Sequence, residues 1–163
     1  MVAVAAILVL AGCAADAPEP EPEELTVTEA GARYLDAICP VNAAWDAVDV
    51  EVDRLRVELA RGEAGNTDPI GSALTGLERK TVAAVELLDD ATVAWPVAAQ
   101  DPVAAVRDTL TADAEQAATA AELSGKELVT YSWDDAGAIS SAAAEARAAL
   151  GLPEDPAAAC DSR

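Results

Sequence analysis

The sequence predicts an all-α fold, more specifically an up-down four-helix bundle with a long, proline-kinked first helix. Hydrophobic residues make up 52% of the chain but aromatic residues only 3%, so the apolar content is mostly Ala, Val and Leu. Alanine and leucine are strong helix formers. Apolar residues also recur at helical spacing in four segments, and the loops between these segments are short enough to make neighbouring helices antiparallel.

The first predicted helix begins near Thr28, an N-cap residue followed by Glu29 in the first turn, and ends at Arg61–Gly62. Pro40 lies inside it and removes one backbone hydrogen bond, which kinks or splits a helix. The apolar stripe continues in phase across Pro40, so we expect a kink. The stripe is an unbroken seven-residue repeat formed by Tyr34, Ile38, Val41, Trp45, Val48, Val52, Leu55 and Leu59.

Three further helices are predicted over Asp68–Val93, Asp101–Ser124 and Ser132–Leu150. Asp–Pro pairs mark the starts of the first two, and a Ser–Asp capping box marks the third. We expect an ordered connection at Leu128–Tyr131 and an irregular tail over Glu154–Arg163. The expected inward-facing residues are Ile70, Leu74, Leu77, Thr81, Val85 and Leu88; Val103, Val106, Leu110, Ala114, Ala117 and Ala121; and Ala136, Ile139, Ala143, Ala146 and Leu150.

An uncharged apolar segment opens the chain and ends in Leu10-Ala11-Gly12-Cys13. It is far shorter than the roughly 20 apolar residues that span a bilayer, and it suits a cleaved signal. The four residues resemble the lipobox of bacterial lipoproteins. That resemblance implies that residues 1–12 are a signal peptide and that Cys13 becomes the lipid-bearing first residue. No Lys or Arg precedes the apolar run, so we expect the natural start to lie upstream of Met1. The alternative is a buried N-terminal helix.

Residues 13–27 follow as the lipidated cysteine and a Pro/Glu-rich tether, and residues 28–163 form the predicted bundle domain. Alternating Pro and Glu disfavours helix and sheet alike, so we expect a semi-rigid spacer. The formal net charge of −20 repels nucleic-acid phosphates and anionic lipid headgroups. We therefore expect no nucleic-acid partner, and a domain that stands off from the membrane holding its anchor.

Lipidation of Cys13 would leave Cys39 and Cys160, an even pair in an exported protein, which indicates a disulfide. In an up-down bundle the start of the first helix and the end of the fourth lie at the same end. The tail beyond the fourth helix gives Cys160 enough chain to reach back to Cys39. The alternative interpretation is a pair of buried free thiols.

No catalytic constellation is found. The chain contains no His, which excludes His-based triads and His metal ligands. It also lacks a Gly-rich phosphate loop, and Ser124 and Ser140–Ser141 have no recognisable base. We therefore expect no catalytic residue, no metal site and no cofactor.

Acidic clusters and a few aromatic residues remain as candidate sites. A solvated surface is the favoured interpretation of the acidic clusters, and a shared cation is the alternative. The clusters are Asp46/Asp49/Asp53, Asp89–Asp90 and Asp134–Asp135. Trp45 is expected in the core, Trp95 at the bundle end that holds Tyr34, and Tyr131 with Trp133 at the opposite end. Exposed aromatics there would either seal the bundle or anchor a partner.

These features favour a membrane-anchored extracytoplasmic lipoprotein that is not an enzyme and acts as an interaction or accessory module of the cell envelope. Its expected partners are the membrane, through the lipid on Cys13, and an envelope protein. The mature part also resembles small alanine-rich helical lipoproteins of actinobacteria that have no assigned activity. The alternative is a solute- or cation-binding bundle that uses a groove near Pro40 or the acidic face.

Overall fold

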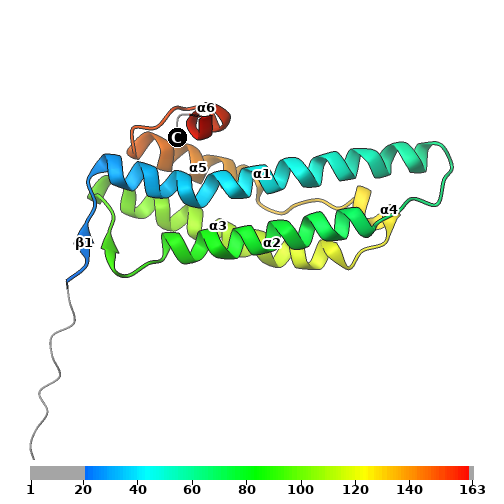
Figure 1. The fold of residues 1–163 in the computed structure, drawn as a ribbon, viewed down its shortest axis with the longest axis horizontal. Helices are drawn as coiled ribbons and strands as arrows, with labels where there is room; N and C mark the ends of the chain where they lie inside the picture. Colours follow the sequence, from blue (N-terminus) through cyan, green and yellow to red (C-terminus); the bar gives the residue numbers. More distant parts are fainter. Residues whose placement is uncertain (1–20, 162–163) are drawn as a thin grey trace, which may run out of the picture.

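The computed structural model describes residues 21–161, and this part of the chain is mostly helical (Figure 1). The prediction of an all-α fold is confirmed. The helices are α1 (Val27–Ala60), α2 (Asp68–Leu88), α3 (Val97–Ala121), α4 (Gly125–Val129), α5 (Ala136–Ala149) and α6 (Pro156–Asp161). Helix α2 packs against α1 and α3, and α3 also packs against α5. Helices α1, α2 and α3 run side by side, whereas α5 and α6 lie beside the N-terminal half of α1.

Helix α1 begins at a capping box two residues earlier than its predicted start. Thr26, rather than Thr28, is the N-cap: its Oγ1 accepts a hydrogen bond from the Glu29 backbone N–H at 3.3 Å. In return the Glu29 carboxylate accepts a bond from the Thr26 backbone N–H at 2.9 Å, and the hydrogen bonds from Thr26 lower the pKa of Glu29. The helix continues through Pro40 to Ala60 without a break, so it is not split there.

The predicted stripe of α1 faces the core. Its fully buried members include Tyr34 and Leu55, each 1% exposed, while Trp45, Val52 and Leu59 are partly buried and pack against the core edge. The stripe of α2 is confirmed at Ile70, Leu74, Leu77, Thr81 and Leu88, whereas Val85 is only partly buried and Ala84, at 1% exposure, is buried instead. Heptad spacing therefore identified the buried faces of the first two helices correctly.

The predicted boundary between the second and third helices is wrong on both sides. Helix α2 ends at Leu88, and α3 begins at Val97 with Pro96 as its N-cap, so Pro102 lies inside α3. Pro102 is the sixth residue of α3, so it lies beyond the first four positions whose N–H groups have no helical partner, and it removes one backbone hydrogen bond from the helix. Burial of Ala99 at 0% and Val103 at 2% exposure fixes this extra turn against the core.

The second half of α3 packs in a different register from the one predicted. Its buried residues continue as Leu110, Asp113, Ala117 and Ala120, whereas Ala114 and Ala121 are only partly buried. Alanines occupy both faces of this segment, so they did not discriminate between the two registers. An aspartate is consequently placed in the core at 2% exposure.

The region after α3 is more helical than predicted. The third helix stops at Ala121, and α4, which is capped by Ser124 and Glu127, extends into the connection expected at Leu128–Tyr131. The expected capping box of Ser132 and Asp135 is absent: Asp135 is the N-cap of α5 in a left-handed conformation with φ 59° and makes no side-chain cap bond. The tail that was expected to be irregular forms α6.

The C-terminal end of the segment predicted to be a tether belongs to the fold. Strand β1 (Glu23–Glu24) pairs in parallel with β2 (Val93–Ala94) in the loop between α2 and α3. The Glu23 N–H donates to the Thr92 carbonyl at 2.9 Å, and the Leu25 N–H donates to the Ala94 carbonyl at 3.0 Å. The four residues that resemble a lipobox, Cys13 among them, lie outside the described residues.

Candidate binding sites along helix α1

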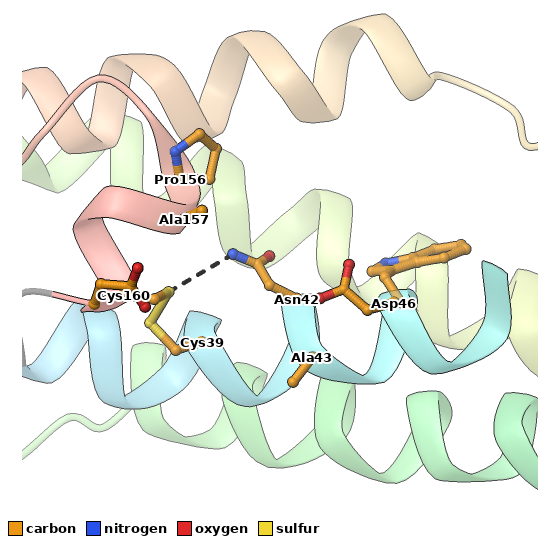
Figure 2. A pocket seen from close by; sticks show the side chains of 9 residues that line it. Cys39, Asn42, Ala43, Asp46, Pro156, Ala157 and Cys160 are labelled. Atoms are coloured by element: carbon orange, nitrogen blue, oxygen red, sulfur yellow. Dashed lines mark hydrogen bonds between the residues drawn. A yellow bond between two sulfur atoms is a disulfide. The ribbon is translucent and has the colours of Figure 1, made fainter. Parts of the chain in front are cut away.

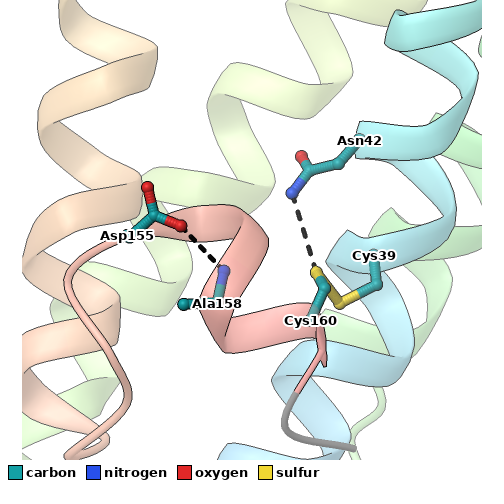
Figure 3. Close-up of a disulfide and its surroundings, with 5 residues drawn as sticks. All are labelled: Cys39, Asn42, Asp155, Ala158 and Cys160. Atoms are coloured by element: carbon teal, nitrogen blue, oxygen red, sulfur yellow. Dashed lines mark hydrogen bonds between the residues drawn. A yellow bond between two sulfur atoms is a disulfide. The ribbon is translucent and has the colours of Figure 1, made fainter.

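A disulfide between Cys39 and Cys160 joins α6 to α1 (Figure 3). The two Cα atoms are 5.7 Å apart, and the two cysteines are separated by 121 positions in the sequence. Helix α6 is positioned locally by Asp155, whose Oδ1 accepts the Ala158 backbone N–H at 2.7 Å, with Pro156 in the first turn. The pairing predicted from the cysteine count is therefore present in the structure.

A hollow of about 390 Å³ lies beside this disulfide, between α1 and α6 (Figure 2). It lies near the place where the alternative interpretation put a solute-binding groove, although Pro40 is not among its lining residues. The Asn42 amide nitrogen lies 3.9 Å from the Cys160 sulfur, so this side chain faces the disulfide. The lining residues are Cys39, Asn42, Ala43, Trp45, Asp46, Pro156, Ala157, Cys160 and Asp161.

The acidic row on α1 is exposed to solvent. Asp46, Asp49 and Asp53 are all exposed, and Asp53 forms an ion pair of 2.9 Å with Arg56. Among residues 21–161 no group of three or more Asp, Glu, Cys or His side chains could hold a metal ion. The described part of the chain therefore offers the cation-binding alternative no preformed cluster.

Two other acidic residues hold the loop between α2 and α3. Asp90 pairs with Arg33 of α1 at 2.6 Å, and Asp89 pairs with Arg107 of α3 at 2.7 Å. Hydrogen bonds from Thr92, followed by Arg33, lower the pKa of Asp90. These contacts give Asp89–Asp90 a structural role at the loop that carries β2.

Three aromatic residues form a cluster beside the middle of α1. The Trp45 and Trp133 ring centroids are 4.6 Å apart with the planes at 80°, and the Tyr131 and Trp133 centroids are 5.3 Å apart at 83°. Such edge-to-face pairs are favourable beyond their burial. The prediction that Tyr131 and Trp133 lie at a bundle end is wrong for Trp133, which reaches the side of α1. Helix α5 begins only at Ala136, and the connection before it carries these rings to α1.

A cavity of about 160 Å³ lies under this cluster. Its size is comparable to the roughly 150 Å³ cavity that accommodates benzene in an engineered protein. Its walls are aromatic and aliphatic, with one carboxylate and one guanidinium, which is the composition typical of small-molecule sites. The lining residues are Trp45, Val48, Asp49, Val52, Arg56, Leu74, Ala120, Leu128, Tyr131 and Trp133. Trp45 lines both this cavity and the disulfide hollow.

Buried polar groups form a second set of features, and the sequence reasoning predicted the burial of Tyr34 but not that of Asp113 or Arg147. Asp113 Oδ1 has no hydrogen-bond partner among residues 21–161, and burial raises the pKa of Asp113 to about 6. Burial also raises the pKa of Tyr34 to about 12, against the opposing effect of the Arg147 guanidinium. Arg147 donates to the Glu154 carbonyl at 3.0 Å and so holds the start of the tail. The buried residues Val103, Val106 and Leu110 are three and four residues apart. Continuing that alternation along α3 would have predicted that Asp113 is buried.

The serines considered as candidate nucleophiles have structural partners. Ser124 caps α4, the Ser140 hydroxyl donates to the Ala136 carbonyl at 3.1 Å, and the Ser141 hydroxyl lies 3.4 Å from a Glu145 carboxylate oxygen.

In the helices of residues 21–161, no stretch is both long and apolar enough to span a bilayer. Comparisons with protein-family models, with curated proteins and with solved structures found no match.

Proposed function

We propose that the protein is a membrane-anchored extracytoplasmic lipoprotein whose helical domain is a non-enzymatic interaction or accessory module of the cell envelope. The observation that carries the proposal is the Leu10-Ala11-Gly12-Cys13 sequence directly after an uncharged apolar segment. In this proposal α1, α2, α3 and α5 constitute an up-down bundle with a short fourth helix and a kink at Pro40. Residues 14–22 remain as the tether.

Two features of the folded part support this proposal, one for the compartment and one for the distance from the membrane. The Cys39–Cys160 disulfide is typical of proteins that fold in an oxidising compartment. The net charge of −20 keeps the domain away from anionic headgroups, so the lipid on Cys13 would hold a domain that does not itself adhere to the bilayer. An exposed surface held at a fixed distance from the membrane suits recognition of an envelope protein.

Crosslinking in intact cells tests this proposal. Cells producing the wild-type chain and cells producing Cys13→Ser are crosslinked under mild conditions, and the tagged protein is then purified from membranes. We expect one envelope protein to be captured reproducibly by the wild-type chain and to be strongly depleted with Cys13→Ser, because the variant lacks the anchor. Recovery of no partner with the wild-type chain would count against an interaction module.

A second candidate function is the binding of a small solute in the aromatic cavity. The observation that favours it is the arrangement of Trp45, Tyr131 and Trp133 around a hollow with Asp49 and Arg56 in its lining. An aromatic wall and a few polar groups are the usual elements of such a site. Because a ligand that binds only the folded state raises its stability, the melting temperature reports occupancy.

Thermal melts with indole, phenol, calcium and magnesium test this candidate. At a ligand concentration about tenfold above Kd, we expect stabilisation of about 1.4 kcal/mol, or roughly 3–6 °C for a domain of this size. Trp133→Leu should abolish the shift with an aromatic solute, whereas Trp95→Leu, in the loop between α2 and α3, should retain it. If no probe at millimolar concentration raises the melting temperature of the wild-type chain, this candidate is excluded.

A further inference from the structure

A groove of about 370 Å³ runs along α2 and α3 and is not part of the sites on α1. Side chains of these two helices alone form it. Its lining residues are Glu78, Val82, Val85, Glu86, Thr111, Ala114, Glu115 and Ala118. Unlike the aromatic cavity, it is open along its length, so its shape suits an elongated segment of a partner molecule.

The floor of the groove is apolar and exposed. Val82 has 46% of its surface exposed, and Val85 beside it is half-buried. On the α3 side the floor consists of Ala114 and Ala118, whose small side chains project little from the helix backbone. A partner backbone could therefore approach α3 closely, and exposed apolar area of this kind in a furrow is typical of an interaction surface.

The rim of the groove is acidic. Glu78 and Glu86 stand on the α2 side, two helical turns apart, and Glu115 stands on the α3 side. None of the three forms an ion pair with another residue in the 21–161 range. An apolar floor between unpaired carboxylates is complementary to a surface that has apolar anchors flanked by cations.

We propose that this groove docks a basic amphipathic helix of a partner protein. Glu78 and Glu86 are eight residues apart, or about 12 Å along α2, which two to three turns of a partner helix would cover. Its apolar residues at positions i, i+4 and i+7 would contact Val82, Val85 and Ala118, and its Lys or Arg residues would face the glutamates. The inference deepens the proposed interaction module by naming the chemistry of its partner.

Other occupants fit the groove less well. In a symmetric dimer of this chain, the same patch would meet itself and bring two sets of rim glutamates together, without a cation to neutralise them. An anionic membrane surface would be repelled by the same carboxylates. A basic amphipathic helix has apolar residues for the floor of the groove and cations for its acidic rim.

Binding of a synthetic helix-forming peptide of leucine and lysine, with the leucines on one face, tests the inference. Fluorescence anisotropy with the full chain measures affinity, and circular dichroism measures the helix gained by the peptide. Val82→Gln with Ala118→Gln should weaken binding at least tenfold, because polar side chains then occupy the floor. Val50→Gln with Ala47→Gln, on the exposed side of α1, should change it less than twofold.

A charge-matched pair of variants separates docking from general attraction to an acidic protein. Glu78→Gln, Glu86→Gln and Glu115→Gln together should weaken binding about tenfold, whereas replacing Asp46, Asp49 and Asp53 of α1 by Asn should weaken it no more than two- to threefold. Equal losses in the two triple variants, or binding without helix formation, would overturn the inference. The assay does not involve the lipid anchor, so its failure and the failure of the proposed function are distinguishable.

Discussion

Replacing Cys39 and Cys160 together by serine is expected to lower the free energy of unfolding by about 4–5 kcal/mol. The disulfide connects residues 121 positions apart, so it removes a large amount of conformational freedom from the unfolded chain. In the folded state it also fixes α6 against α1, where Ala159 is 1% exposed. The loss should appear as a lower urea midpoint by circular dichroism at neutral pH.

The control for this prediction is the chain that keeps Cys39 and Cys160, treated with a reducing agent. Both proteins carry Cys13→Ser in these measurements, so that no third thiol exchanges with the pair. Reduction should lower the stability of the chain with the disulfide to that of the double serine variant, and it should leave the variant unchanged. A difference below about 1 kcal/mol would show that the bridge does not constrain the unfolded chain as the loop-entropy argument requires.

Asp113→Asn is expected to stabilise the protein above pH 6 by about 3 kcal/mol and to have little pH-dependent effect near pH 4. Burial raises the pKa of Asp113 from 3.8 to about 6, since its carboxylate is desolvated in the folded state. One pKa unit corresponds to about 1.4 kcal/mol, and a carboxyl whose folded pKa is raised loses stability as the pH rises. The wild-type chain therefore loses stability between pH 3.8 and pH 6. Asparagine does not ionise, so the variant does not lose stability at this position.

Urea unfolding between pH 4 and pH 7.5 measures this effect as the difference between the two proteins at each pH. The difference should grow in favour of Asp113→Asn across the window and then remain constant. Asp101→Asn, an exposed aspartate of the same helix, is the matched control and should give curves parallel to the wild type. Parallel curves for Asp113→Asn as well would contradict a raised pKa at this position.

The sequence predicted best where bulky apolar residues repeat without interruption. Tyr34, Val41, Val48 and Leu55 lie one heptad apart, and all four are buried. Large side chains on one face leave a single way to bury the helix, so the face of α1 was determined by the pattern alone. The disulfide followed from the number of cysteines and their place in the chain.

The predictions failed where residue types leave more than one solution. In the second half of α3, alanines on two faces made the register ambiguous, and the correct one buries Asp113. At Pro96 and Pro102 either proline could start a helix, and tertiary burial of Ala99 and Val103 decided for the first. The pairing of Glu23–Glu24 with β2 is a long-range contact that the local preference of a Pro/Glu segment does not contain.

The candidate sites required the three-dimensional arrangement. Trp45 and Trp133 are far apart in sequence, and their contact depends on where α5 begins. Likewise the groove between α2 and α3 depends on which alanines of α3 remain outside the core, which the predicted register had partly reversed. Composition indicated an acidic protein, but only the packing places three unpaired glutamates around Val82.

Metabolic labelling with radioactive palmitate is the most direct test of the central claim that Cys13 carries a lipid. Cells producing the wild-type chain should incorporate label into the protein and retain it in the membrane fraction. Cys13→Ser should incorporate none and should leave that fraction. A wild-type chain without label, or identical fractionation of the two chains, would contradict the account.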